Sequence, residues 1–452
     1  MDRQCISEYS LPSIVCAGAI DASRKPKHAE PRIHECEVDK AEVSWTFRVY
    51  PFPAVHATRR AIRKWFNSPV MRFAGALLLL PLIAAAWFSI QLARADAEFR
   101  RGTPESTAHA AMLVPDNTEY ILLRAMQLDY DGADPTALLE RAAALNPMNA
   151  APRIRLGLAA EIRGDSSTAE KWLLDAARVN RQFEPRWTLA NFYFRQGNPE
   201  QFWKWMRAAL DVSYGDRRPA FELCWNMSSD ANEIFSRAIP ERREVLDAYL
   251  GYLNETRRSA AIPPVALKLA SVNHPTDRPV LLNAVDVLIA AGDAASAKNL
   301  WQALGYAASS IVFRGDFAPP AVGAGFDWRF SANPGIAHLA IDQPRLMHRI
   351  TFDGSEAESA ELLRQVVNLT PHARYQLSWE SRTQGIASPA GIAWRIAGQS
   401  GSVASSENAT AGQLEFVAPS GLIPLTLIYS RPPGETRAEG SIELWHVAIA
   451  PY

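Results

Sequence analysis

The chain has 452 residues, of which 48% are hydrophobic and 21% charged, so most of it can bury a core and little has the composition of a disordered protein. Its formal net charge of -1 argues against a general nucleic-acid binder, because such proteins show a basic excess. Its 4 cysteines include no C-x-x-C pair, which excludes a disulfide-built or zinc-rich scaffold.

The first part of the chain, residues 1–70, is rich in proline, histidine and arginine and shows no sustained period of 2 or 3.6 residues. We expect it to be a disordered cytoplasmic tail, or sequence upstream of a true start at Met71. It carries three of the cysteines, and they are isolated from one another.

The segment 73–93 contains no charged residue and is almost wholly apolar between 76 and 90. A helix of that length spans about 30 Å, which matches the hydrocarbon core of a bilayer. The sequence therefore predicts a single transmembrane helix, with Trp87 and Phe88 near one membrane interface. Basic residues are more numerous before the segment than after it, which favours a cytoplasmic N-terminus and an extracytoplasmic C-terminus.

Two alternatives remain for this segment. Ala93-Arg94-Ala95 is an A-x-A pattern, so the segment could be a cleaved signal peptide that starts at Met71. It could also be a buried core helix, although such helices rarely lack a polar face over this length.

Residues 105–306 show a helical period and an internal repeat. The stretch RIRLGLAAEIRGD at 153–165 aligns with RWTLANFYFRQGN at 186–198, and Gly164 and Gly197 are 33 residues apart. A glycine supplies the positive φ that ends a helix, and small residues let paired helices approach. The positions that define the repeat are Leu156, Gly157, Gly164, Ala169, Leu189, Ala190 and Gly197.

This pattern resembles the tetratricopeptide repeat, whose unit has about 34 residues. Further units are visible at 120–147 and 281–304, and less regular helical hairpins lie between. Arg153 and Arg186 depart from the resemblance, since an aromatic residue is common near the repeat start. The resemblance implies an α-solenoid of helical hairpins at 105–306 whose concave face binds a protein or peptide. The aromatic residues of 172–205 could line that groove, but their helical spacing favours packing between helices.

From about residue 310 the period changes from 3.6 to 2. Turn residues separate short alternating segments at 310–313, 337–341, 347–352, 362–369, 373–381, 390–396, 412–418, 424–430 and 440–448. Such a succession predicts an antiparallel β-sandwich at 308–452. The fold class expected for the whole chain is α + β multidomain.

The sandwich region resembles jelly-roll carbohydrate-binding or galactose-binding-like modules. The resemblance rests on VFRGDF at 312–317, GFDWRF at 325–330, ITFDG at 350–354 and the strand, proline turn and strand of 365–382. It implies a sugar site built on aromatic side chains, because a flat ring stacks on a pyranose. The candidates for glycan binding are Trp328, Arg329, Trp379 and Trp394, with Tyr375 and Trp445 as further aromatics. Core packing is the alternative for Trp379 and Trp394, whereas the FDWRF segment favours a surface position for Trp328.

Some such modules also bind a structural calcium, for which Asp316, Asp353 and Glu443 would be the oxygen ligands; solvated turns are the simpler interpretation, and no cofactor is expected. No catalytic residues and no metal ligands are assigned, because the chain has no G-x-S-x-G, Walker, G-x-G-x-x-G or H-E-x-x-H motif. The acidic run from Asp353 to Glu361 could supply a carboxylate pair for glycoside hydrolysis, but it follows a turn and favours a solvated loop.

The sequence as a whole resembles membrane-anchored bacterial repeat proteins that accompany envelope polysaccharide assembly or export. We therefore expect a non-enzymatic scaffold in the bacterial inner membrane, with the bulk of the chain on the periplasmic side. Its expected partners are a protein on the solenoid, a polysaccharide or second protein on the sandwich, and the membrane through one helix. The alternatives are a glycan receptor and a carbohydrate-active enzyme.

Overall fold

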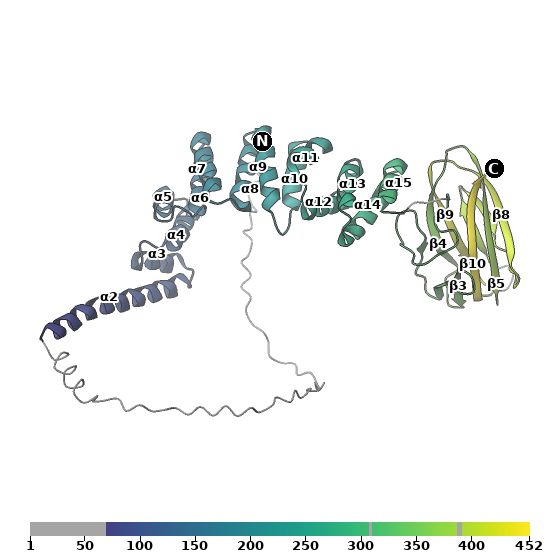
Figure 1. Cartoon of the computed structure of the whole chain (residues 1–452), viewed down its shortest axis with the longest axis horizontal. Helices are drawn as coiled ribbons and strands as arrows, with labels where there is room; N and C mark the ends of the chain where they lie inside the picture. Colours follow the sequence, from purple (N-terminus) through teal and green to yellow (C-terminus); the bar gives the residue numbers. More distant parts are fainter. Residues whose placement is uncertain (1–68, 307–309, 387–390) are drawn as a thin grey trace, which may run out of the picture. The chain divides into compact units, whose positions relative to one another are not determined.

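The computed structural model describes residues 69–306, 310–386 and 391–452. In these residues α-helices come first and strands follow, as Figure 1 shows. The helices are α2 (Pro69–Phe99), α3 (Pro104–Leu113), α4 (Thr118–Tyr130), α5 (Thr136–Leu145), α6 (Ala151–Ile162), α7 (Ser166–Val179), α8 (Phe183–Arg195), α9 (Pro199–Val212), α10 (Arg218–Met227), α11 (Ala231–Ala238), α12 (Arg243–Glu255), α13 (Ile262–Val272), α14 (Arg278–Ala290) and α15 (Ala294–Ala303). The expected order, helical hairpins before an antiparallel β-sandwich, is confirmed.

Helix α2 contains the segment for which the sequence predicts a membrane span. Across the residues that the structure describes, no helix combines the length and the apolar character needed to cross a membrane. The side chains of residues 73–76 and of Leu78 lie outside that description, as do residues 1–68 of the expected tail. Near its end α2 contacts the first hairpin, where the ring of Phe99 lies 4.8 Å from that of Tyr120.

The turn inside three of the helical hairpins has the same two-residue form. Gly164, Gly197 and Gly292 have φ of 82°, 64° and 80°, a conformation that glycine adopts without strain. The next residue is an Asp or Asn whose side chain accepts a hydrogen bond from a backbone N–H in the first turn of the following helix. One glycine thus ends the first helix and the adjacent polar residue begins the second.

The arginines that depart from the repeat resemblance connect helices to one another. Arg153 at the start of α6 donates to Asp175 Oδ2 of α7 at 2.6 Å and to the carbonyl of Asn149 at 2.8 Å. One repeat later, Arg186 of α8 donates to the carbonyl of Ala208 in α9 at 2.7 Å. The Arg153–Asp175 and Arg186–Ala208 hydrogen bonds both span 22 residues. The same arginine link between paired helices therefore recurs, with a carboxylate as acceptor in one repeat and a helix carbonyl in the next.

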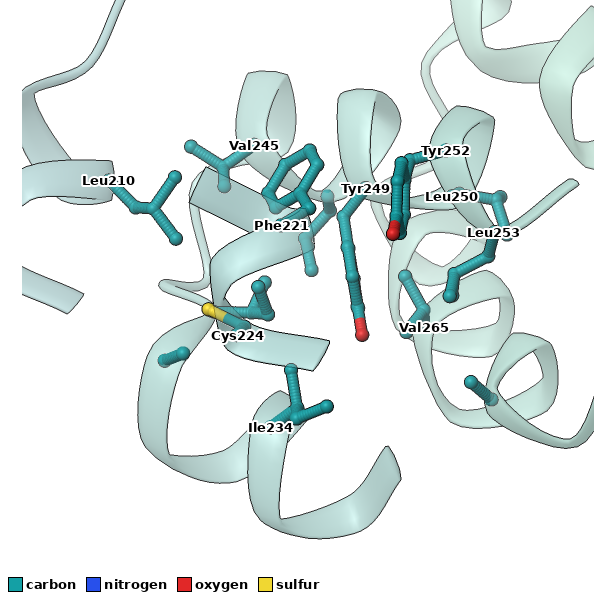
Figure 2. Close-up of a cluster of buried hydrophobic side chains, with 14 of the residues drawn as sticks. Leu210, Phe221, Cys224, Ile234, Val245, Tyr249, Leu250, Tyr252, Leu253 and Val265 are labelled. Carbon is teal, nitrogen blue, oxygen red and sulfur yellow. The ribbon is translucent and has the colours of Figure 1, made fainter. Parts of the chain in front are cut away.

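The solenoid core is continuous from Ala160 to Phe326. Its middle is shown in Figure 2, where Phe221 of α10 packs against Tyr249 of α12 with the ring centroids 4.9 Å apart and Cys224 lies close by. Gly157 lets α6 and α7 approach, because a Cβ there would lie 2.7 Å from the side chain of Leu173. The aromatic residues Phe192, Tyr193, Phe202 and Trp203 are buried in this core, so packing accounts for them.

The sandwich has two antiparallel sheets. The strands are β1 (Arg329–Phe330), β2 (Ile336–Ile341), β3 (Met347–Asp353), β4 (Ser359–Asn368), β5 (Arg374–Gln384), β6 (Ile392–Ile396), β7 (Gln399–Ser402), β8 (Thr410–Val417), β9 (Leu422–Ser430) and β10 (Glu439–Pro451). One sheet has the order β1-β4-β9-β6-β7 and the other β2-β3-β10-β5-β8. Alternate residues of both sheets form a shared core, as the period of 2 requires.

The segment 310–328 lies between the solenoid and the first strand. The predicted strand at 310–313 is wrong, because these residues form a bend that leads into a turn. Phe313 is held by the side-chain amide of Gln365, which accepts from the N–H of Phe313 at 3.1 Å and donates to its carbonyl at 2.7 Å. Phe313 and Phe326 belong to the solenoid core and pack edge-on against Trp301 of α15. This segment therefore covers the last helical hairpin.

Candidate functional site

The three tryptophans expected at a glycan site lie in the sandwich core. Trp328 is 1% exposed, donates from Nε1 to the carbonyl of Arg314 at 2.9 Å, and packs against Trp394 with ring centroids 5.9 Å apart. Trp379 lies against Gly401 and Gly412, where any Cβ would meet its ring. The expected surface position of Trp328 is wrong, because its ring packs inside the sandwich core against Phe317 and Trp394. None of these rings can stack on a ligand.

Arg329 does not lie at a free surface for glycan binding either. Its guanidinium forms an ion pair with Asp286 of α14, and the same carboxylate accepts a hydrogen bond from the backbone N–H of Gly325 at 2.7 Å. Arg329 is therefore a contact residue between the helical region and the sandwich.

One tryptophan of the sandwich lies outside both core clusters. Trp445 is in β10, where the register against β5 shifts between Leu444 and His446. Such a bulge adds one residue to the strand and re-aims its side chains. Leu444 and Val447 therefore face the core, while Trp445 lies on the outer face of the sheet β2-β3-β10-β5-β8.

The contacts of Trp445 are polar. Its Nε1 donates to Glu380 of β5, which also accepts from Arg345 at 3.0 Å. The guanidinium of Arg345 lies over the indole, 4.8 Å from the ring centroid. The hydrogen bonds from Trp445 and then from Arg345 hold the pKa of Glu380 below its ordinary value. Trp445 is only 6% exposed, although Arg345 and Glu380 around it are far more open.

Next to Trp445 an ion triad crosses three strands. Glu443 of β10 pairs in register with Arg349 of β3 and with Arg382 of β5, and both guanidinium groups donate to its carboxylate. Burial raises the pKa of Glu443, but the hydrogen bonds and charges of Arg382 and Arg349 outweigh it and hold the pKa below the ordinary value. We call the following six residues the Trp445 patch: Trp445, Arg345, Glu380, Glu443, Arg349 and Arg382.

The carboxylates considered for calcium are engaged elsewhere. Glu443 is held by two arginines, Asp353 accepts from the N–H of Ser355 at 2.9 Å, and Asp316 accepts from the N–H of Ala318 at 3.3 Å. Among the described residues no group of three or more His, Cys, Asp or Glu side chains could hold a metal ion.

Two groups that could take part in catalysis are structural. Glu356, from the acidic run considered for glycoside hydrolysis, is buried and accepts from the hydroxyl of Tyr429 and the N–H of Ala438, each at 3.0 Å. Cys224 is fully buried in the solenoid core, and this burial raises the pKa of its thiol, which keeps it protonated and inert.

A hollow lies on the solenoid between α4, α5 and α6. It has a volume of about 130 Å³ and mostly apolar walls, and Asp129 and Arg155 are its charged lining residues. Ile162, at the end of α6, is 85% exposed beside it. We call it the α4–α6 groove; the side chains that the argument uses are Met126, Leu158 and Ile162.

Most of the Trp445 patch was not identified from the sequence, although a signal was present. In β5, Trp379 and Ser381 alternate with Glu380 and Arg382, so a core assignment for Trp379 puts the two charged residues on the outer face. The bulge in β10 has no such local signal.

The described residues form a helical-hairpin array followed by a β-sandwich, and solved structures with low TM-scores to this chain include the following three. A CBM4 structure is 13% identical, with a TM-score of 0.25, and covers 31% of this chain and 99% of its own. TmCBM61, solved with β-1,4-galactotriose, is 18% identical, with a TM-score of 0.23, and covers 32% of this chain and 98% of its own. YrrB, a TPR protein with an unusual peptide-binding site, is 11% identical, with a TM-score of 0.23, and covers 45% of this chain and 92% of its own.

At such TM-scores these similarities do not identify the function of this chain. No protein-family model matches its sequence, and no curated protein matches it.

Proposed function

We propose that this chain is a non-catalytic scaffold of the bacterial envelope, anchored in the inner membrane by α2. In this proposal the solenoid binds a protein partner and the sandwich contacts a glycan through the Trp445 patch. The observation that carries the proposal is the position of Trp445, a large aromatic side chain on the outer face of a sheet that contacts the charged groups of Glu380 and Arg345.

An aromatic ring beside fixed polar groups is the arrangement that recognises sugars. The indole face packs against the C–H groups of a pyranose, and nearby carboxylates and guanidinium groups bind its hydroxyls. In the Trp445 patch these polar groups are already oriented by one another, since Glu380 and Glu443 each accept from two partners. Preorganisation of this kind lowers the entropic cost of binding.

The test is glycan binding by the full chain in detergent. Trp445→Ala should weaken binding to a recognised polysaccharide by roughly 1–3 kcal/mol, because the stacking platform is lost. Trp445 is 6% exposed, so Trp445→Ala should also lower thermal stability, and binding is compared at a temperature at which circular dichroism shows both proteins fully folded. Trp205→Ala, a half-buried tryptophan of α9, is the matched control and should leave glycan binding unchanged. Equal affinities for the wild type and Trp445→Ala would contradict the proposal.

The α4–α6 groove supports a protein partner for the solenoid. Met126, Leu158 and Ile162 offer an apolar surface in a groove that Asp129 and Arg155 also line, which suits a peptide with a large apolar side chain and nearby charges. Ile162→Asp should abolish capture of the partner from membranes, whereas Leu174→Asp on α7, outside the groove, should retain it. Capture that both variants retain would count against this role.

The proposed membrane anchor rests on the charge-free segment 73–93, part of whose side chains lie outside the described residues, and on the surface of α2. This helix is continuous from Pro69 to Phe99, and its apolar side chains Leu80, Ile83 and Trp87 are all more than half exposed. Exposed apolar residues on every side of a helix suit a lipid environment. A reporter fused after Tyr452 should appear outside the cytoplasm and in the membrane fraction. Soluble protein that begins at Asp96 would instead identify a cleaved signal peptide.

A further inference from the structure

The side chain of Arg345 lies over the indole ring of Trp445 and can move away from it. Arg345 lies in the turn between β2 and β3, and its side chain is 53% exposed. It is held by one hydrogen bond to Glu380 and by its position over the indole. An ion pair and a cation–π contact made by a side chain as exposed as that of Arg345 are both weak interactions, so Arg345 can be displaced by a ligand.

The charges around the indole are unequal. The Trp445 patch has three arginines, Arg345, Arg349 and Arg382, and two glutamates, so it carries one excess positive charge. Arg349 and Arg382 share Glu443, which is nearly buried between them. Arg345 is therefore the guanidinium most free to change its partner.

We propose that the Trp445 patch takes a saccharide that carries a carboxylate, that is, a polysaccharide containing uronic acid. This inference rests on the proposed glycan contact. A pyranose that stacks on Trp445 must move Arg345 off the ring, and a carboxylate on the same sugar gives the displaced guanidinium a new charged partner. Guanidinium binds carboxylate through two parallel hydrogen bonds, which a hydroxyl cannot match. A neutral sugar would also displace Arg345 from the indole but would offer its guanidinium no carboxylate to bind.

The test compares two polymers that differ only in charge. The full chain in detergent is titrated with polygalacturonate and with its methyl ester, and alginate serves as a second acidic backbone. We expect binding of at least one acidic polymer, on the order of tenfold tighter than binding of the ester, and weaker at high salt. Arg345→Gln should abolish the preference, and Arg345→Lys should keep part of it because the charge remains.

The matched control is Arg364→Gln, which removes an exposed arginine from β4 in the other sheet and should keep the preference. Trp445-dependent binding of neutral and acidic polymers with equal affinity would overturn the acidic assignment and leave the proposed glycan contact intact. A lack of binding to both acidic polymers would also overturn it. Failure of Trp445→Ala to affect any glycan would remove the proposed function itself.

Discussion

At the scale of single residues, the sandwich buries a pair of histidines. His348 of β3 stacks on Phe330 with centroids 4.2 Å apart, and its Nε2 lies 3.0 Å from Nδ1 of His338 in β2. Each ring has a second nitrogen that is buried without a hydrogen-bond partner. Burial, and then the nearby His338, lowers the pKa of His348 from 6.5 to about 3. The folded protein therefore keeps His348 neutral in mildly acidic solution.

The neutral histidine makes the stability of the sandwich depend on pH. Above pH 6.5, His348 is neutral in both the folded and the unfolded protein. Between pH 6.5 and about 3, His348 is protonated in the unfolded protein but stays neutral in the folded one. The free energy of unfolding therefore decreases as the pH falls through this range. The loss should reach about 2 kcal/mol at about pH 5. His348→Gln should reduce this pH dependence in urea unfolding followed by tryptophan fluorescence. His446→Gln, at an exposed position, should keep it, and an unchanged pH dependence in His348→Gln would refute the explanation.

At the scale of elements, the helical hairpins follow from local chemistry. The glycine that ends the first helix and the Asp or Asn that caps the second are adjacent in the sequence, so the turn needs no distant residue. The spacing of Gly164 and Gly197 therefore predicts the repeat from the sequence alone. The sequence does not reveal the hydrogen bonds of Arg153 and Arg186 between helices, because each acceptor lies 22 residues away and one of them is a backbone carbonyl.

Two glycines of the solenoid should respond to alanine in opposite directions. At Gly164 φ is 82° and a Cβ would meet nothing within 4 Å, so Gly164→Ala adds backbone strain alone and should destabilise the chain by about 1 kcal/mol. Gly251 lies inside α12 without a positive φ, and its nearest Cβ neighbour is 4.0 Å away. Gly251→Ala should therefore stabilise by roughly 0.5–1 kcal/mol. Thermal unfolding followed by circular dichroism at a helical wavelength tests both; destabilisation by both, to the same extent, would contradict this account.

At the scale of the whole molecule, residues Ala85–Tyr452 form one compact unit in which the segment before the sandwich covers the last hairpin. Solenoids need a cap on their terminal repeat because its core face has no neighbour. Here Phe313 and Phe326 cover Trp301, and Gly325 lies so close that a Cβ would be 2.5 Å from that ring. The segment 310–328 thus stabilises the last helical hairpin of the solenoid.

The contact at Asp286 should hold this cap in place. Asp286→Ala removes the acceptor of the Gly325 N–H and the partner of Arg329, and hydrogen exchange in residues 320–330 should become faster. Exchange followed by mass spectrometry measures this directly. Glu255→Ala, which breaks an exposed pair with Arg218, is the control and should leave exchange in residues 320–330 unchanged. Unchanged exchange in Asp286→Ala would show that the apolar contacts alone hold the cap.

The sequence by itself determined the helical hairpins and the alternating strands, because a period of 3.6 or 2 and the residues of a turn act over a few positions. The sequence could not decide which tryptophans lie in the core and which lie on the outer face of a sheet. Trp328, in an irregular segment, is buried by β6 and by residues near Arg314, whereas Trp445 lies on the outer face at a bulge that returns Val447 to the core. Arg329 likewise finds its partner 43 residues earlier in the chain. Which side chains reach the surface depended on contacts between distant segments, and only the tertiary structure decided them.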